Sequence, residues 1–121
     1  MQKNQVVIAD DALFIRTRLK DLLQRQEFEV VGEATTGIET LEVVRATNPH
    51  ILLLDITMPK MTGIEILPIL KAEYPNLNII ICSALHDEGV IQECLNLGAY
   101  AYIKKPYKKD VLIQTLLNCR Q

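Results

Sequence analysis

The chain has 121 residues, a formal net charge of −2 and 49% hydrophobic residues. This length suits one domain with a sizeable buried core, so we expect residues 1–121 to form a single domain. The small negative charge gives no basic surface that would attract nucleic acid or an anionic membrane, so we expect neither as a partner.

No apolar run approaches the length of a membrane span, and the first residues lead into a strand pattern rather than a signal peptide. We therefore expect a cytoplasmic protein. The three cysteines, Cys82, Cys94 and Cys119, follow no metal-binding spacing, so we expect buried free thiols. His50 and His86 match no ligand spacing either, and the sequence gives them no role.

Strand and helix patterns alternate along the chain. In chain order, the sequence predicts a strand at 5–9, a helix at 12–26, a strand at 28–34, a helix at 37–47, a strand at 51–54, a helix at 64–74, a strand at 78–82, a helix at 87–97, a strand at 101–104 and a helix at 108–119. Arg16 is expected on the polar face of the first helix, and Pro68 should remove a hydrogen bond from the third helix or mark an early turn. Five such alternations predict an α/β fold with a doubly wound parallel sheet.

The run from Ile51 to Leu54 is four consecutive aliphatic residues that end at Asp55. An apolar run this short is typical of a central parallel strand covered on both faces. Asp55 then lies at the carboxyl end of the strand, where open α/β sheets bind ligands. Taken alone, an aspartate there would more often cap the following turn than bind a ligand.

Polar residues also follow three other predicted strands: Asp10-Asp11, Ser83 and Lys105. Parallel strands share one direction, so these residues should meet at one edge of the sheet. Each pair of carboxylates ~5 Å apart repels by roughly 3 kcal/mol at an effective dielectric of ~20, so the three aspartates need a cation. One divalent metal together with Lys105 would compensate them, and an oxygen-only ligand set suits Mg²⁺.

This set of residues resembles the receiver domain of response regulators in two-component signalling. The motifs that carry the resemblance are Asp10-Asp11, Asp55 with Met58-Pro59 and Gly63, Ser83-Ala84 and Lys105-Pro106. They span essentially the whole chain. The resemblance implies a flavodoxin-like, five-stranded sheet of strand order 2-1-3-4-5.

The resemblance also implies a phosphoryl transfer site. Asp55 would accept a phosphoryl group from a histidine kinase, and Asp11, Asp55 and the backbone carbonyl of Thr57 would bind Mg²⁺, with Asp10 acting through a water. Such a protein is a phosphoacceptor switch that assists its own phosphotransfer and dephosphorylation, rather than an enzyme in the usual sense.

The resemblance also implies which further residues contact the phosphoryl group and transmit the signal. Lys105 and Ser83 would contact phosphoryl oxygens, and the peptide between Lys105 and Pro106 would be cis. Movement of Ser83 would let the ring of Tyr102 turn inward and reshape an output face. Two apolar residues of the fourth helix would form the centre of that face: Ile91 and Leu95.

Residues 10–16 and 55–59 look most like those of chemotaxis response regulators, which implies a stand-alone protein that acts on the flagellar motor switch. A receiver domain of a longer regulator, with a DNA-binding or enzymatic output, is the alternative. An Mg²⁺-dependent aspartyl phosphatase is a third reading, but such enzymes usually carry an aspartate where this chain has Thr57. We expect a monomer, and dimerisation on phosphorylation stays open.

Overall fold

The computed structural model describes residues 4–119, in which five strands form one parallel sheet and five helices flank it. In chain order the elements are β1 (Asn4–Ala9), α1 (Leu13–Gln24), β2 (Phe28–Ala34), α2 (Gly37–Thr47), β3 (Ile51–Leu54), α3 (Gly63–Glu73), β4 (Asn78–Ser83), α4 (Glu88–Asn96), β5 (Ala101–Lys104) and α5 (Lys109–Asn118). The strand order is β2-β1-β3-β4-β5. The predicted fold class and strand order are therefore confirmed.

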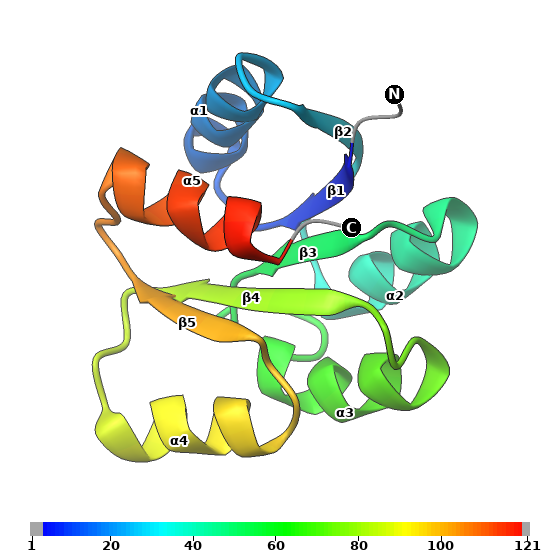
Figure 1. Ribbon diagram of the computed structural model, residues 1–121. Coiled ribbons are helices and arrows are strands. Elements are labelled where there is room, and N and C mark those ends of the chain that lie inside the picture. Colours follow the sequence, from blue (N-terminus) through cyan, green and yellow to red (C-terminus); the bar gives the residue numbers. More distant parts are fainter. Residues whose placement is uncertain (1–3, 120–121) are drawn as a thin grey trace.

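Three layers build the molecule. Helices α1 and α5 cover one face of the sheet, and α2, α3 and α4 cover the other (Figure 1). Alternate residues of β3 enter the two cores: Leu53 packs on the α1 and α5 side, whereas Leu52 and Leu54 pack on the opposite side. This strand is buried on both faces, as its apolar run predicts, and it carries Asp55 at its carboxyl end.

α2 has the predicted boundaries, and the boundaries of the other four helices differ from the predicted ones by one or two residues. α1 is shorter than predicted, since it begins at Leu13 and ends at Gln24. Pro68 does lie within α3, and the helix continues through it. Pro68 itself is exposed, and its missing N–H leaves the carbonyl of Ile64 without its usual helical donor.

The loop after β3 is anchored to the first turn of α2. The backbone amides of Gly37 and Ile38 donate to the carbonyl oxygens of Pro59 at 3.2 Å and Lys60 at 3.1 Å. Free amides at a helix start need such acceptors. A β-carbon on Gly37 would lie 2.1 Å from the Met61 carbonyl oxygen, so only glycine permits this close approach.

The three cysteines are free and buried, as predicted. No helix within residues 4–119 is long and apolar enough to cross a membrane. The predicted domain spans residues 1–121, of which residues 1–3 and 120–121 lie outside the described part of the chain. The prediction made for the first residues of the chain also falls on residues 1–3.

Candidate functional site

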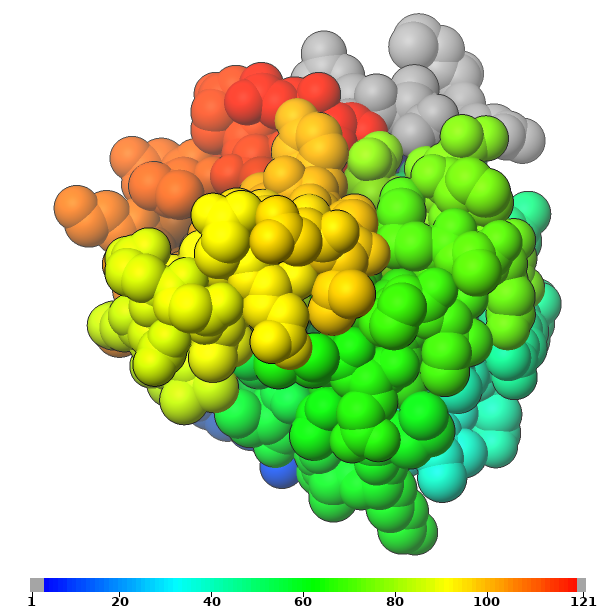
Figure 2. Space-filling view, turned by 90° about the horizontal axis from the view of Figure 1, so that it is seen from below, coloured from blue at the N-terminus to red at the C-terminus, as the bar shows by residue number. Residues whose placement is uncertain are grey.

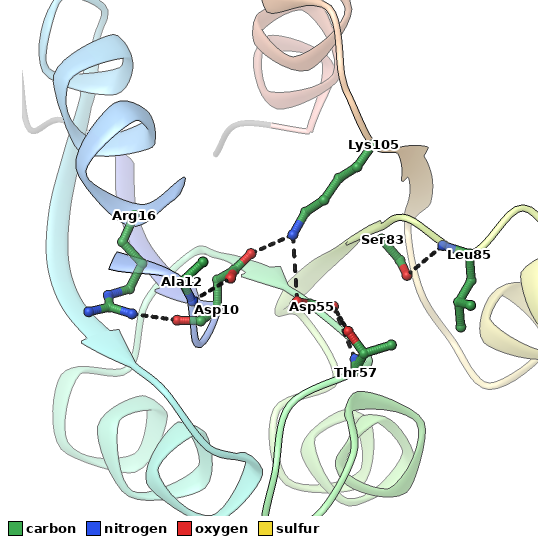
Figure 3. A network of polar contacts seen from close by, with 8 residues as sticks. All are labelled: Asp10, Ala12, Arg16, Asp55, Thr57, Ser83, Leu85 and Lys105. Atoms are coloured by element: carbon green, nitrogen blue, oxygen red, sulfur yellow. Dashed lines mark hydrogen bonds and ion pairs between the residues drawn. The ribbon is translucent and has the colours of Figure 1, made fainter. Parts of the chain in front are cut away.

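The carboxyl edge of the sheet brings together side chains from four strands (Figure 3). Asp10 and Asp11 follow β1, Asp55 follows β3, Ser83 is the last residue of β4, and Lys105 follows β5. Parallel pairing of neighbouring strands places these ends side by side. Residues separated by up to 95 positions thereby come into contact.

Asp10 is almost completely buried, and its backbone and side-chain polar groups are held by four neighbours. Its amide donates to the Ala34 carbonyl at 3.0 Å, and its carbonyl accepts from the Arg16 guanidinium at 2.7 Å. One carboxylate oxygen accepts from the Ala12 amide at 2.9 Å, and the other lies 2.6 Å from Lys105 Nζ. Such a clamped carboxylate cannot swing, which fixes the geometry of the first loop.

Asp55 is also buried, and its two carboxylate oxygens have different partners. Oδ1 accepts from the Thr57 amide at 3.0 Å and from the Thr57 hydroxyl at 2.9 Å. Oδ2 lies 3.5 Å from Lys105 Nζ. The sequence pointed only to the backbone carbonyl of Thr57, and its hydroxyl contact was missed. A hydroxyl residue two positions after a strand-end aspartate is the signal that could have found this contact.

Three carboxylates meet at this edge. One oxygen each from Asp10, Asp11 and Asp55 lies within 4.8 Å of the others. With Lys105 included, the formal charge of the cluster is −2, which one divalent cation would neutralise. The Asp11 carboxylate is exposed and has no hydrogen bond or ion pair to residues 4–119, so it is free to bind a ligand. This oxygen donor set and charge fit Mg²⁺.

Lys105 is held as a cation between Asp10 and Asp55. Burial lowers the pKa of Lys105, but the hydrogen bond that Lys105 donates to Asp10 and the charges of Asp55 and Asp10 outweigh burial, so the pKa is raised. The peptide between Lys105 and Pro106 is cis, as the resemblance implied. Beneath the site, burial raises the pKa of the Cys82 thiol to about 12, so this thiol stays protonated and takes no part in the chemistry.

The loop after β4 is linked to Ser83 and to β5 through one residue, Leu85. The Ser83 hydroxyl accepts from the Leu85 amide at 3.1 Å, and the Tyr102 hydroxyl donates to the Leu85 carbonyl at 2.7 Å. Within the described part of the chain, Ser83 makes no hydrogen bond to Asp55. The ring of Tyr102 is half-buried, and burial raises its pKa.

Both histidines make contacts that the sequence did not indicate. His86 Nε2 lies 3.1 Å from the carbonyl oxygen of Lys105, which ties the loop after β4 to the loop after β5. His50 Nδ1 accepts from the Gln5 amide at 2.9 Å at the opposite edge of the sheet. Long-range contacts of this kind leave no local spacing pattern.

The two predicted output residues lie on the outer side of α4. Leu95 is 38% exposed and Ile91 is half-buried, and neither belongs to the two core clusters of residues 4–119. Figure 2 shows α4 in yellow, between the green of α3 and the orange and red of β5 and α5. This position leaves the surface of α4 available to a partner.

Comparison with known proteins decides the family. A family model of the response regulator receiver domain matches residues 6–117. The chain belongs to this family. Receiver domains are signalling switches of two-component systems that bind Mg²⁺ at their acidic pocket, and they work with a histidine kinase and a downstream effector.

Individual relatives agree with this membership. The receiver chain is 38% identical to the chemotaxis protein CheY of Listeria monocytogenes, over 93% of its own length and 94% of that protein. It is 37% identical to the transcriptional regulatory protein YhcZ of Bacillus subtilis, over 92% of the chain but only 52% of that protein. The solved complex of CheX and CheY with BeF₃ and Mg²⁺ from Borrelia burgdorferi is similar in structure, with a TM-score of 0.90, 32% identity and coverage of 95% of this chain and 87% of that one.

Proposed function

We propose that this receiver domain is a phosphorylation-dependent switch in which Asp55 accepts a phosphoryl group from the phosphohistidine of a histidine kinase. The observation that carries the proposal is the position of Lys105, whose ammonium lies within 3.5 Å of both Asp10 and Asp55 beside the exposed carboxylate of Asp11. A nucleophile, a cation and a free metal ligand thus share one open edge.

The transfer exchanges one bond for another. An Asp55 carboxylate oxygen forms a bond to phosphorus while the phosphorus–nitrogen bond of the phosphohistidine breaks, and the electron pair stays on the imidazole nitrogen. The amide and hydroxyl of Thr57 hold Oδ1 and thereby orient the carboxylate for attack. Burial of Asp55 limits the water that competes with the donor.

The surrounding residues stabilise the charge that the phosphoryl group carries. Asp11, Asp55 and the Thr57 carbonyl would hold Mg²⁺, with Asp10 acting through a water; bound there, Mg²⁺ supplies electrostatic stabilisation of the phosphoryl oxygens. The Lys105 ammonium can contact a second phosphoryl oxygen with a small change of its side chain, because it already lies 3.5 Å from Asp55. The Ser83 hydroxyl would donate to a third.

A change at Leu85 would carry the signal outward. A phosphoryl group on Asp55 would draw the Ser83 hydroxyl away from the Leu85 amide, and the Tyr102 hydroxyl would lose its fixed acceptor when that loop moves. Shifting an equilibrium from 1:99 to 99:1 takes about 5.5 kcal/mol. Two or three charge-assisted hydrogen bonds to the phosphoryl group, at ~1.5–3 kcal/mol each, can supply this.

The surface of α4 near Ile91 and Leu95 would then bind the effector. The similarity to CheY of Listeria monocytogenes over almost the full length of both proteins supports a chemotaxis role. For that role we propose the flagellar motor switch as the partner. The 52% coverage of YhcZ favours the second candidate, in which the same domain controls a DNA-binding output. In either case we propose that residues 1–121 form one receiver domain.

Incubation with Mg²⁺ and acetyl phosphate tests the proposal. We expect one alkali-labile phosphoryl group per chain in the parent, and none in Asp55→Asn. Asp21→Asn, which changes an exposed aspartate of α1, is the charge-matched control and should label like the parent. Repeated turnover of unrelated phosphomonoesters would instead support a phosphatase and overturn the switch.

A further inference from the structure

We propose that Arg16, braced by Glu33, is a positioning residue for the metal site because it fixes the peptide that joins Asp10 to Asp11. The inference rests on the magnesium site proposed above. Arg16 lies on α1 and Glu33 on β2, and neither belongs to the acidic cluster. The guanidinium of Arg16 nevertheless donates to the backbone of that cluster, at the Asp10 carbonyl (Figure 3).

Arg16 uses two sides of its guanidinium group. Its Nε donates to Glu33 Oε1 at 2.9 Å, and its Nη1 donates to the Asp10 carbonyl at 2.7 Å. Only 11% of the side chain is exposed, which is low for an arginine on a surface helix. Because the planar guanidinium is held by Glu33 on one side and by the Asp10 carbonyl on the other, its orientation is fixed. The Asp10 carbonyl that it binds is thereby fixed as well.

The held carbonyl determines where Asp11 lies. A peptide unit is planar, so fixing the Asp10 carbonyl also fixes the direction of the bond toward the Asp11 α-carbon. The Asp11 carboxylate has no partner of its own among residues 4–119, in contrast to the carboxylates of Asp10 and Asp55. The position of this metal ligand therefore depends on its backbone, and the contact from Arg16 orients that backbone.

Glu33 keeps Arg16 in place and shares its charge with a second cation. Its Oε2 lies 2.9 Å from Lys20 Nζ, on the next turn of α1. Lys20 thus pairs with the same carboxylate as Arg16, but no contact joins Lys20 to Asp10. Lys20→Met is therefore a control that removes the same charge and the same kind of partner without touching the metal loop.

Charge and positioning predict opposite results for Arg16→Met. Removing a positive charge near an acidic site should tighten Mg²⁺ binding if Arg16 acts only through its field. Releasing the Asp10 carbonyl should weaken binding, by about tenfold or more as for other residues that orient metal ligands. Arg16→Lys keeps the charge but cannot donate to both acceptors in the same plane, so it should weaken binding by an intermediate factor.

The test is a magnesium titration of the full chain, followed through the backbone amide signals of residues 10–12 by NMR. Urea unfolding without Mg²⁺ confirms that each variant is folded. We expect the dissociation constant to rise about tenfold in Arg16→Met, to rise less in Arg16→Lys, and to stay at or slightly below the parent value in Lys20→Met.

Two outcomes would overturn the inference. One is Mg²⁺ binding that is tighter or unchanged in Arg16→Met and also unchanged in Arg16→Lys. If Arg16→Met does not fold, the Mg²⁺ affinity of Arg16→Lys decides. The other is a loss of Mg²⁺ affinity in Lys20→Met equal to that in Arg16→Met. That result would show that the ion pairs of Glu33 affect Mg²⁺ binding without the contact to the Asp10 carbonyl. A parent that does not bind Mg²⁺ would refute the proposed metal site itself, so the two failures are distinguishable.

Discussion

The ammonium of Lys105 lies 2.6 Å from Oδ2 of Asp10, although the two residues are 95 positions apart in the sequence. The same nitrogen is 3.5 Å from Oδ2 of Asp55. Lys105 is therefore bound more closely to Asp10 than to Asp55, the proposed phosphoacceptor. It can turn toward a phosphoryl group on Asp55 without crossing the site.

Replacing this lysine should expose the repulsion among the aspartates. In Lys105→Met, we expect the free energy of unfolding without Mg²⁺ to fall by about 2–3 kcal/mol, somewhat below the ~3–5 kcal/mol of a fully buried pair because the ammonium is partly accessible. Mg²⁺ should restore more stability in this variant than in the parent. Urea unfolding with and without Mg²⁺ measures both effects.

Lys104→Met provides the control for that experiment. Lys104 is exposed, and its ammonium lies 3.7 Å from Oε1 of Glu88, which is not part of the acidic cluster. We expect a change in unfolding free energy of less than about 1 kcal/mol and no altered response to Mg²⁺. Equal behaviour of the two variants would contradict the compensating role of Lys105.

The Thr57 hydroxyl should contribute measurably to the order of Asp55. Thr57→Val keeps the backbone amide contact but removes the hydroxyl donor to Oδ1, so we expect a loss of about 1 kcal/mol in unfolding free energy and slower phosphorylation. Thr115→Val, which removes an exposed hydroxyl contact on α5, should leave the phosphorylation rate unchanged. The rate of labelling by acetyl phosphate distinguishes the two, and identical rates would rule out the orienting role.

Two glycines near helix starts should respond in opposite ways to alanine. Gly37→Ala places a β-carbon 2.1 Å from the Met61 carbonyl oxygen, so the loop after β3 must move, and we expect a loss of at least about 2 kcal/mol. Gly89→Ala meets only Oδ1 of Asp87 at 3.0 Å, a side-chain atom that needs to shift by a few tenths of an ångström while it caps α4, and should gain up to about 1 kcal/mol. Chemical denaturation measures both changes. A Gly37→Ala variant as stable as the parent would show that the loop is not anchored at α2.

The pH dependence of stability should report on Glu33. Burial raises its pKa, but hydrogen bonds from Lys20 and Arg16 outweigh burial, so the pKa lies below the ordinary value of 4.5. A lowered pKa in the folded state adds stability above about pH 4.5, and this is lost as the pH falls through the folded pKa. The stability difference between the parent and Glu33→Gln should therefore shrink in acid, as urea unfolding against pH would show. A difference that stays constant down to about pH 3 would contradict the ion-pair network.

The sequence predicted the alternating strands and helices of a parallel sheet because each element carries a local pattern, whereas the strand order was implied by the family resemblance. The apolar run from Ile51 to Leu54 can be satisfied only by a strand with both faces covered, and this determines which edge carries Asp55. Parallel pairing then brings Asp10, Asp11 and Lys105 to the same edge, as the structure shows.

Contacts that hold the site in place were not predictable in the same way. Arg16 fits the polar side of a helix by its spacing, yet its guanidinium is buried against a carbonyl of another segment. His86 likewise contacts the backbone carbonyl of Lys105, whose position depends on the folded loops. The Thr57 hydroxyl differs, because its acceptor is the Asp55 carboxylate only two residues away. Every residue carries a backbone carbonyl, so the sequence gives no signal for which of them a distant side chain will bind.

The central claim is that Asp55 carries the phosphoryl group. After phosphorylation by a histidine kinase or acetyl phosphate in Mg²⁺, borohydride reduction converts the phosphorylated aspartate to homoserine, which peptide mass spectrometry locates. We predict homoserine at position 55 alone, dependent on Mg²⁺ and absent from Asp55→Asn. Homoserine at position 10 or 11, or undiminished labelling of Asp55→Asn, would contradict the assignment.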